Sequence, residues 1–411
     1  MRSGRILPAV DDRSRILLLR GLRAFAYGFT SVVLGVHLAD LQHAHALTSW
    51  EAGAIVTATL GGAAALSALL GARGDRIGRR RAHVALSFAM AGAMSVFAFT
   101  SSFAALFLAA LTGTVATTFL ESGPFVALEQ AMLPHAVAPE LRTRSFGRYS
   151  AIAYVTGSVG SLAAGGPDAI RHYLHTAPSS QRWFLLPAAL AIVSVAVAAR
   201  LSRVVEAPEG QRKPLGPSRG KVYRLSGLFA IDGLGGGFVV NTLIAYWFRS
   251  KFGTSTEVLG VIFFGVGLLQ SGSVLVSSRL AERIGLVKTM VFTHLPSNAL
   301  LIAIPLVPSE TWAVVLLLAR FALSQMDVPA RQSYVVAVVT PEERTAASSF
   351  TTTAKSAAQA VSPSISGPAV QAAGSGLPFY LGGGLKILYD ILLWRSFRKI
   401  HTPEEEARAH R

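Results

Sequence analysis

The sequence predicts an all-helical membrane protein whose twelve transmembrane helices form two pseudo-symmetric six-helix bundles. Three observations lead to this fold class. Of the 411 residues, 51% are hydrophobic and only 15% are charged, and the mean hydropathy is +0.47, which is outside the usual balance of a soluble domain. Apolar runs of about 18–25 residues recur, each long enough to cross a hydrocarbon core of about 30 Å as a helix. Short charged motifs also repeat at a nearly constant spacing.

The apolar runs define the order of the elements. A backbone in lipid must satisfy its own hydrogen bonds, so each run is expected to be helical. They divide the chain into an N-terminal tail (1–16), a first bundle (17–200), a linker (201–223), a second bundle (224–396) and a C-terminal tail (397–411). The expected spans are 17–40, 50–70, 82–100, 103–132, 145–165, 182–200, 224–248, 257–278, 287–307, 311–337, 346–370 and 378–396. Gly123-Pro124 and Pro329 are expected to break the helices of spans four and ten.

The charges of the chain predict its orientation and exclude several classes of function. The net charge is +16, but Lys and Arg cluster in alternate loops and form no continuous basic face, which favours a membrane over a nucleic acid as partner. The positive-inside rule then predicts both termini in the cytoplasm and the plasma membrane, or bacterial inner membrane, as location. The chain has no cysteine, which excludes disulfides and thiolate metal sites. We expect no cofactor and no metal.

The two bundles are related by an internal repeat. Asp75-Arg-Ile-Gly78 matches Glu282-Arg-Ile-Gly285 after 207 positions. Pro139-Glu-Leu-Arg-Thr143 matches Pro341-Glu-Glu-Arg-Thr345 after 202, and Gly28-Phe29 matches Gly237-Phe238 after 209. Three matches in the same order predict parallel repeats of six helices related by an axis along the membrane normal.

The first copy of the charged motif lies between spans two and three. Its glycines permit a tight turn and close helix approach, and Asp75 can sit at a helix N-terminus or accept from Arg. The motif, Gly-x-x-x-Asp-Arg-x-Gly-Arg-Arg, is complete at Gly71, Asp75, Arg76, Gly78, Arg79 and Arg80.

In this motif the chain resembles a transporter of the major facilitator superfamily. The resemblance implies a transporter rather than an enzyme, a small-molecule substrate, a monomer, and contacts of the motif that latch the cytoplasmic ends of the two halves. The second copy keeps Glu282, Arg283 and Gly285 but has Ser278 in place of the leading glycine, so its latch should be weaker. The alternative is a basic turn that only orients the protein.

Ionisable residues inside the spans are the candidate functional groups, because each costs about 2.5–3.5 kcal/mol to insert. Most of them lie in spans one, four, seven and ten, which line the central cavity in the superfamily that the chain resembles. The repeat pairs Arg23 with Asp232, Glu121 with Asp327, and Glu129 with Arg331. Arg320 in span ten lies opposite Gly113, whereas drug–proton antiporters of the superfamily carry an Arg early in span four.

We expect a polar cluster in the cytoplasmic half of this cavity, with Glu121 and Asp232 as the first choices for a proton-carrying carboxylate. Asp327 and Arg331, spaced i,i+4, could instead neutralise each other. Arg23, Glu129 and Arg331 have a structural alternative, in which they snorkel to the inner interface.

Further polar residues complete the candidate site. Lys355 is expected to be a counter-ion or a substrate contact, whereas Lys386 and Asp390 are interpreted as a structural i,i+4 pair. The remaining candidates for a pocket that takes an amphiphilic organic ligand are Tyr27, Gln130 and Asn241.

These features favour a proton-driven exporter of a small organic or drug-like molecule that works by alternating access. A proton symporter that imports a nutrient, such as a sugar or an organic acid, is the alternative. A protein of the same shape that senses a ligand and transports nothing is a third possibility, and the sequence leaves the substrate open.

Overall fold

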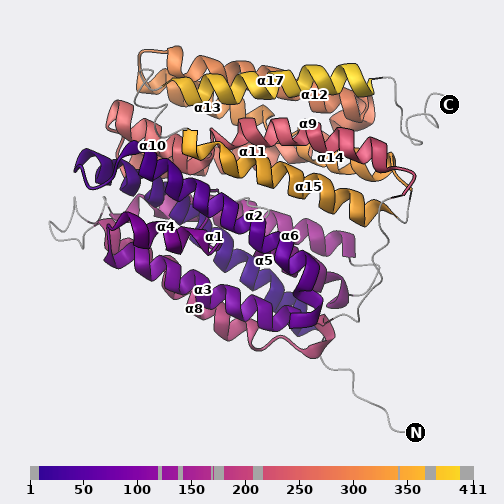
Figure 1. Cartoon of the computed structure of the whole chain (residues 1–411), viewed down its shortest axis with the longest axis horizontal. Helices are drawn as coiled ribbons and strands as arrows, with labels where there is room; N and C mark the ends of the chain where they lie inside the picture. Colours follow the sequence, from indigo (N-terminus) through magenta and orange to yellow (C-terminus); the bar gives the residue numbers. More distant parts are fainter. Residues whose placement is uncertain are drawn as a thin grey trace, which may run out of the picture.

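The computed structural model consists of two bundles of helices that lie side by side (Figure 1). It describes residues 9–118, 123–137, 142–167, 170, 180–206, 216–340, 343–365 and 376–398. Within these ranges the description does not extend to the side chains of residues 9–11, 71–76, 142–144, 180, 278, 282, 336, 344 and 345.

The first bundle, the N half, follows the predicted order of spans. Its helices are α1 (Ala9–His43), α2 (Ser49–Ile77), α3 (Arg79–Phe99), α4 (Phe103–Leu111), α5 (Pro124–Met132), α6 (Arg142–Ala163) and α8 (Leu185–Ala198). Span four is interrupted between α4 and α5, and Pro124 begins α5 where its missing N–H costs nothing. This confirms the predicted break at Gly123-Pro124.

The second bundle, the C half, repeats this layout. Its helices are α9 (Arg219–Gly237), α10 (Asn241–Phe252), α11 (Thr256–Ile284), α12 (Leu286–Ala303), α13 (Glu310–Leu323), α14 (Asp327–Ala337), α15 (Arg344–Val361) and α17 (Leu377–Phe397). Span seven is interrupted after Gly237, and span ten is interrupted at 324–326 rather than at Pro329. Pro329 instead lies in the first turn of α14, where proline is tolerated.

Among the described residues, eight helices are long and apolar enough to cross a membrane. The four expected spans that are not long or apolar enough by this criterion are the interrupted span four and the helices α6, α15 and α17. Interruption shortens span four, and α17 contains Lys386 and Asp390, both of which are buried. The helix α15 contains a run of small polar residues and Lys355. In α17 the two charged side chains are therefore directed inward.

The internal repeat is visible in the packing of glycines. A side-chain carbon at Gly28 of α1 would overlap the carbonyl oxygen of Gly157 in α6, and one at Gly237 of α9 would overlap the carbonyl oxygen of Gln359 in α15. Gly237 follows Gly28 by 209 positions and Gln359 follows Gly157 by 202. The offsets found in the sequence thus connect equivalent close contacts in the two halves.

The glycines of the charged motif form equivalent turns. Helix α2 continues to Ile77 and α11 to Ile284, about two turns beyond the predicted ends of these spans. Gly78 and Gly285 then change the chain direction at φ values of 89° and 93°, a region that glycine adopts readily. The predicted tight turn is confirmed, and it consists of a single residue in each half.

The halves contact each other mainly at the side of the molecule that lies away from the start of α1 and the end of α17. We call the side where α1 begins and α17 ends the terminal side and the other the opposite side (Figure 1). The principal helix pairs that join the halves are α1–α10, α2–α15 and α6–α11. One hydrophobic core joins the N half to parts of α10 to α13, α15 and α17, whereas a second, separate core around Phe229, Tyr334 and Leu393 lies within the C half.

Candidate functional site

The N half contains a buried carboxylate that is held by three side chains. Glu129 of α5 accepts hydrogen bonds from both terminal nitrogens of Arg23 in α1, and Arg23 Nη2 lies 2.7 Å from Oε2. The Tyr149 hydroxyl donates to the same oxygen at 2.7 Å, and His83 Nε2 lies 3.0 Å from Oε1. A two-pronged Arg–carboxylate contact is among the stronger ion pairs in proteins. Arg23 and Glu129 therefore do not snorkel: both side chains are buried.

The C half contains a carboxylate with a larger group of cations. Asp232 of α9 is buried and lies 2.5 Å from Lys355 Nζ, 2.6 Å from Lys386 Nζ and 3.2 Å from Arg331 Nη1. His294 Nε2 of α12 approaches to 3.9 Å. Helices α9, α12, α14, α15 and α17 thus meet at one carboxylate. Buried charges need such partners, because an uncompensated one is strongly destabilising.

Two further carboxylates extend this C-half network. Arg331 Nη1 also lies 2.9 Å from Asp327 Oδ2, which confirms the predicted i,i+4 contact. Asp390 lies 2.9 Å from His294 Nδ1 and accepts from Asn298 Nδ2 at 3.1 Å. Lys386 binds Asp232, so it and Asp390 have different hydrogen-bonding partners within one network.

The ion pairs of the two halves are equivalent in position and opposite in charge. Arg23 and Asp232 are related by 209 positions, and Glu129 and Arg331 by 202. In the N half the first position is basic and the second acidic; in the C half the order is reversed. The same contact between spans one and four therefore recurs between spans seven and ten with its polarity inverted.

Tyr27 and Asn241 lie beside interrupted helices. The Tyr27 hydroxyl donates to the carbonyl oxygen of Thr114, in the non-helical segment after α4, at 3.3 Å. Asn241 is buried and begins α10 after the break in span seven. Non-helical backbone at membrane depth is tolerated where it is enclosed by protein or lines a polar cavity. These two positions are consistent with a central site.

The remaining candidates are not all joined to the ion pairs. Gln130 is exposed on α5. Arg320 is buried, and its Nε and Nη1 atoms have no hydrogen-bond partner among the residues that the structure describes. Glu121 lies outside the described residues.

Several residues of the network were missed by the sequence reasoning. His83, Tyr149, His294 and Asn298 lie in spans three, five and nine, outside the four spans expected to line the cavity. A signal was available for the two histidines, since an ionisable side chain inside an apolar span is costly and needs a partner. No comparable signal marks Tyr149 or Asn298.

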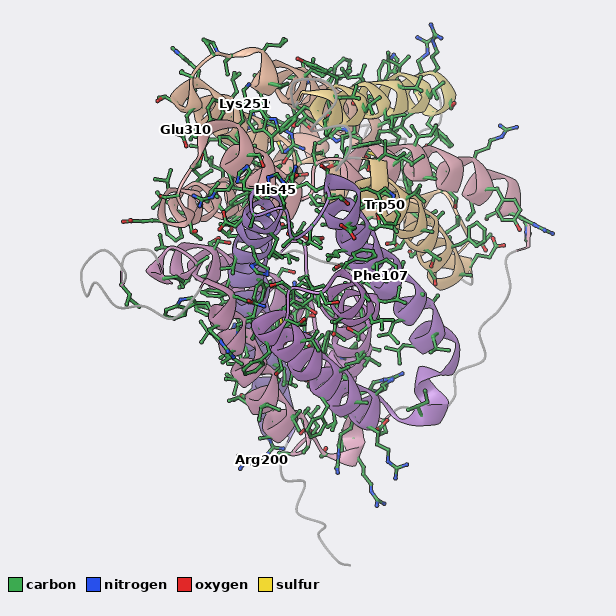
Figure 2. The ribbon with its side chains drawn as sticks, turned by 60° about the vertical axis from the view of Figure 1, so that its left-hand side comes forward. His45, Trp50, Phe107, Arg200, Lys251 and Glu310 are labelled. Carbon is green, nitrogen blue, oxygen red and sulfur yellow. The ribbon has the colours of Figure 1, made fainter. Side chains whose placement is uncertain are left out.

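A second group of polar contacts joins the halves at the opposite side. Arg249 Nε of α10 lies 2.9 Å from Asp40 Oδ1 of α1, and the Tyr246 hydroxyl contacts Gln42 Oε1. The Thr242 hydroxyl donates to the carbonyl oxygen of Ser31 at 3.0 Å. Figure 2 brings this side forward, with His45 and Trp50 near the connection between α1 and α2, and Arg200 at the other end of the N half.

Arg79 and Arg80 of the charged motif form hydrogen bonds with the N half and with the start of the linker. Glu206 accepts from the backbone N–H groups of Arg79 at 2.6 Å and Arg80 at 3.0 Å, at the N-terminus of α3, where an acid is favourable. Arg79 Nη1 donates to the carbonyl oxygen of Ala131 and Arg80 Nη1 to that of Leu201. The proposed latch between the halves stays a prediction, because the side chains of Asp75, Arg76 and Glu282 lie outside the described residues.

In the C half Glu343 has a similar role at the terminal side. It accepts from the backbone N–H of Gly216 and, at 3.2 Å, from that of Ser218 just before α9, and from the Thr340 hydroxyl at 3.0 Å. Hydrogen bonds from Ser218, Gly216 and Thr340 favour the charged form, so the pKa of Glu343 is lowered. Near the terminal side of each half, a carboxylate thus accepts hydrogen bonds from backbone N–H groups at or just before the start of a helix.

Two repeated helical bundles with buried charges are typical of a secondary transporter, and comparison with known proteins identifies the family. The chain belongs to the Major Facilitator Superfamily, which it matches over residues 16–231 and 225–411. A curated relative, the uncharacterized membrane protein YJR124C of Saccharomyces cerevisiae, is 25% identical and covers 90% of this chain and 91% of its own.

Solved transporters share the fold. A bacterial homolog of the human lysosomal transporter Spinster, in an inward-facing and occupied conformation, has a TM-score of 0.72 at 16% identity, covering 95% of this chain and 97% of its own. The nucleoside transporter NupG has a TM-score of 0.70 at 14% identity, with 95% and 100% covered. A D-xylose-proton symporter has a TM-score of 0.67 at 14% identity, covering 93% of this chain and 97% of its own.

Proposed function

We propose that the protein is a proton-coupled exporter of a small organic molecule that works by alternating access in the plasma membrane. The observation that carries this proposal is Asp232, a buried carboxylate in span seven with basic side chains from three other helices within 3.2 Å; this span is one of the four expected to line the cavity. A stable core does not need such a group, and ionisable residues in a membrane bundle commonly belong to ion or substrate pathways.

The proposed orientation follows from the basic residues. Arg79, Arg80, Arg200 and Arg203 lie at or near helix ends on the terminal side, as expected for the cytoplasmic face. The principal contacts between the halves lie on the opposite side, so the state described here is proposed to face the cytoplasm. The fold is shared with a transporter in an inward-facing conformation, which supports this assignment.

Proton coupling would use the partners of Asp232. In the present state three cations compensate its charge. Asp232 is proposed to take up a proton only in a state in which these cations have moved away from it, because a buried carboxylate requires either a partner or protonation. Glu121, equivalent by the repeat to Asp327, is proposed as the second carrier. Arg320, Tyr27 and Asn241 are proposed to contact the substrate.

Proton coupling can be tested with Asp232→Asn and Glu121→Gln in proteoliposomes that contain a pH-sensitive dye. We expect both variants to lose substrate-induced proton movement, because neither amide takes up a proton. Asp390→Asn, which removes a carboxylate from the same network but not from a cavity-lining span, serves as the matched control and should retain proton movement. Flux is normalised to folded protein. Normal acidification by both test variants would refute the carrier assignment.

An importer is the second candidate, because the D-xylose-proton symporter and the nucleoside transporter share this fold. The two functions differ in the direction of substrate movement relative to protons. With an imposed pH gradient, an exporter moves substrate against the proton flow and a symporter moves it with the flow. A screen of organic molecules by thermal shift, which responds to any ligand of the native state, would supply the substrate for this assay.

A further inference from the structure

The inverted ion pairs of the two halves have a consequence for the transport cycle. Arg23–Glu129 and Asp232–Arg331 occupy equivalent positions of a two-fold repeat, with opposite charges. When two surfaces related by a two-fold axis close, the residues near the axis approach their own equivalents. Equal polarity in both halves would bring Arg toward Arg and Glu toward Glu. Inverted polarity brings each residue toward an opposite charge.

The opposite side of the molecule already shows this kind of contact. Asp40 of α1 and Arg249 of α10 are separated by 209 positions, the offset that also relates Arg23 to Asp232, and they form an ion pair between the halves at 2.9 Å. Equivalent positions of spans one and seven, with opposite charges, therefore meet where the halves are closed. Asp40 follows Arg23 by 17 residues along α1, which corresponds to about 25 Å.

We propose that Arg23, Glu129, Asp232 and Arg331 exchange partners when the terminal side closes. The two pairs within the halves are replaced by pairs between the halves, Arg23 with Asp232 and Glu129 with Arg331. The number of ion pairs is the same in both states. The four residues thereby position the halves in the closed state without a large difference in free energy between the states, as a cycling transporter requires.

Other contacts of these residues are compatible with the exchange. Glu129 keeps His83 and Tyr149 as partners within the N half, and Asp232 keeps Lys355 and Lys386 within the C half. Each carboxylate therefore gives up an Arg of its own half without being left as an isolated buried charge, which would be costly.

The natural absence of cysteine allows a direct test. Gln130 and Gln332 are both exposed, follow Glu129 and Arg331 directly, and are separated by 202 positions. We expect the double variant Gln130→Cys/Gln332→Cys to form a disulfide only when the terminal side closes, because the Cα atoms must come within about 7 Å. The cross-linked fraction thus reports the population of that state.

The closed state can be enriched by a wedge on the opposite side. A side-chain carbon at Gly35 of α1 would lie 2.8 Å from Ala245 Cβ and 3.0 Å from Tyr246 N of α10. Gly35→Leu therefore separates α1 from α10 and favours closure of the terminal side. Gly92→Leu is its control, since a carbon there has no heavy atom within 4 Å.

Three charge backgrounds distinguish the exchange from a structural role. The cross-linked fraction should be highest with the native charges, lower with the neutral pair Arg23→Gln/Glu129→Gln, and lowest with the swapped pair Arg23→Glu/Glu129→Arg. We expect the fraction of the swapped variant to be at least about fivefold below that of the native charges, which is a large change in a two-state population. The swapped pair keeps an ion pair within the N half but repels both C-half residues. Tyr149→Phe, which removes a neutral contact of Glu129, should cross-link like the native protein.

A structural role predicts another order. If the Arg23–Glu129 pair only stabilises the N half, the swapped variant should resemble the native protein and exceed the neutral one. That order, or no cross-link in any folded variant with or without Gly35→Leu, overturns the proposal. If the swapped variant does not fold, the neutral variant must still give a lower cross-linked fraction than the native charges in the Gly35→Leu background. The inference rests on the proposed alternating access, but cross-linking measures neither protons nor substrate, so failure of proton coupling would be distinguishable from failure of the exchange.

Discussion

Glu129→Gln is expected to destabilise the protein by about 3–5 kcal/mol, the usual consequence of breaking a buried ion pair by removing one partner. Arg23 is buried at 4% exposure, and Glu129 is its partner at both terminal nitrogens. The variant leaves this guanidinium in a non-polar interior without a counter-charge. Unfolding in mixed micelles by increasing SDS, followed by tryptophan fluorescence, measures the loss.

The double variant Arg23→Gln/Glu129→Gln is the matched comparison. It removes both charges, so no uncompensated charge remains, and we expect it to be more stable than Glu129→Gln alone. A double-mutant cycle with Arg23→Gln isolates the interaction between the two residues. Additive losses in this cycle would show that the two side chains do not interact, and would contradict the N-half site described above.

Gly28→Leu is expected to have a comparable effect through packing. A side chain at Gly28 overlaps the backbone of Gly157, and backbone cannot move aside without separating α1 from α6. We expect a loss of at least about 3 kcal/mol, the upper end of the usual range for overpacking. Gly237→Leu should behave alike, because Gly237 makes the equivalent contact with Gln359 in the C half.

Two helical glycines provide controls for this prediction. A side-chain carbon at Gly92 of α3 or Gly147 of α6 meets no heavy atom within 4 Å. Gly92→Leu and Gly147→Leu should be neutral or slightly stabilising, because Leu favours a helix more than Gly does. Equal losses at Gly28 and Gly92 in the same SDS titration would refute the close contact between α1 and α6.

The fold was predictable because its signals are local and repeated. Apolar runs of membrane-spanning length and matched motifs at offsets of 202–209 positions are visible without any knowledge of contacts. The structure connects the same offsets: Gly28 and Gly237 make equivalent close approaches. The break at Pro124 was also predictable, whereas the break in span ten lies before Pro329, since proline fits the first turn of a helix as well as it ends one.

The site was predictable only in part. Arg23, Glu129, Asp232 and Arg331 could be selected as charges in apolar spans, and the repeat paired their positions. Which residues form hydrogen bonds depends on how the helices face each other, which the sequence does not encode locally. Lys386 therefore forms an ion pair with Asp232 of another helix, and not the predicted i,i+4 pair with Asp390 of its own helix. Likewise, the sequence shows that Asp40 and Arg249 are equivalent in the repeat, but only the contact between the halves shows that they form an ion pair.

The central claim is that two equivalent halves move against each other around buried charges. The most direct measurement is the distance between spin labels at Gln130→Cys and Gln332→Cys, by pulsed electron paramagnetic resonance in lipid nanodiscs. The native protein should give a long distance, as expected for the state described here, together with a shorter one whose population rises with Gly35→Leu. A single distance that does not change with the wedge, with pH or with a bound ligand would contradict the account.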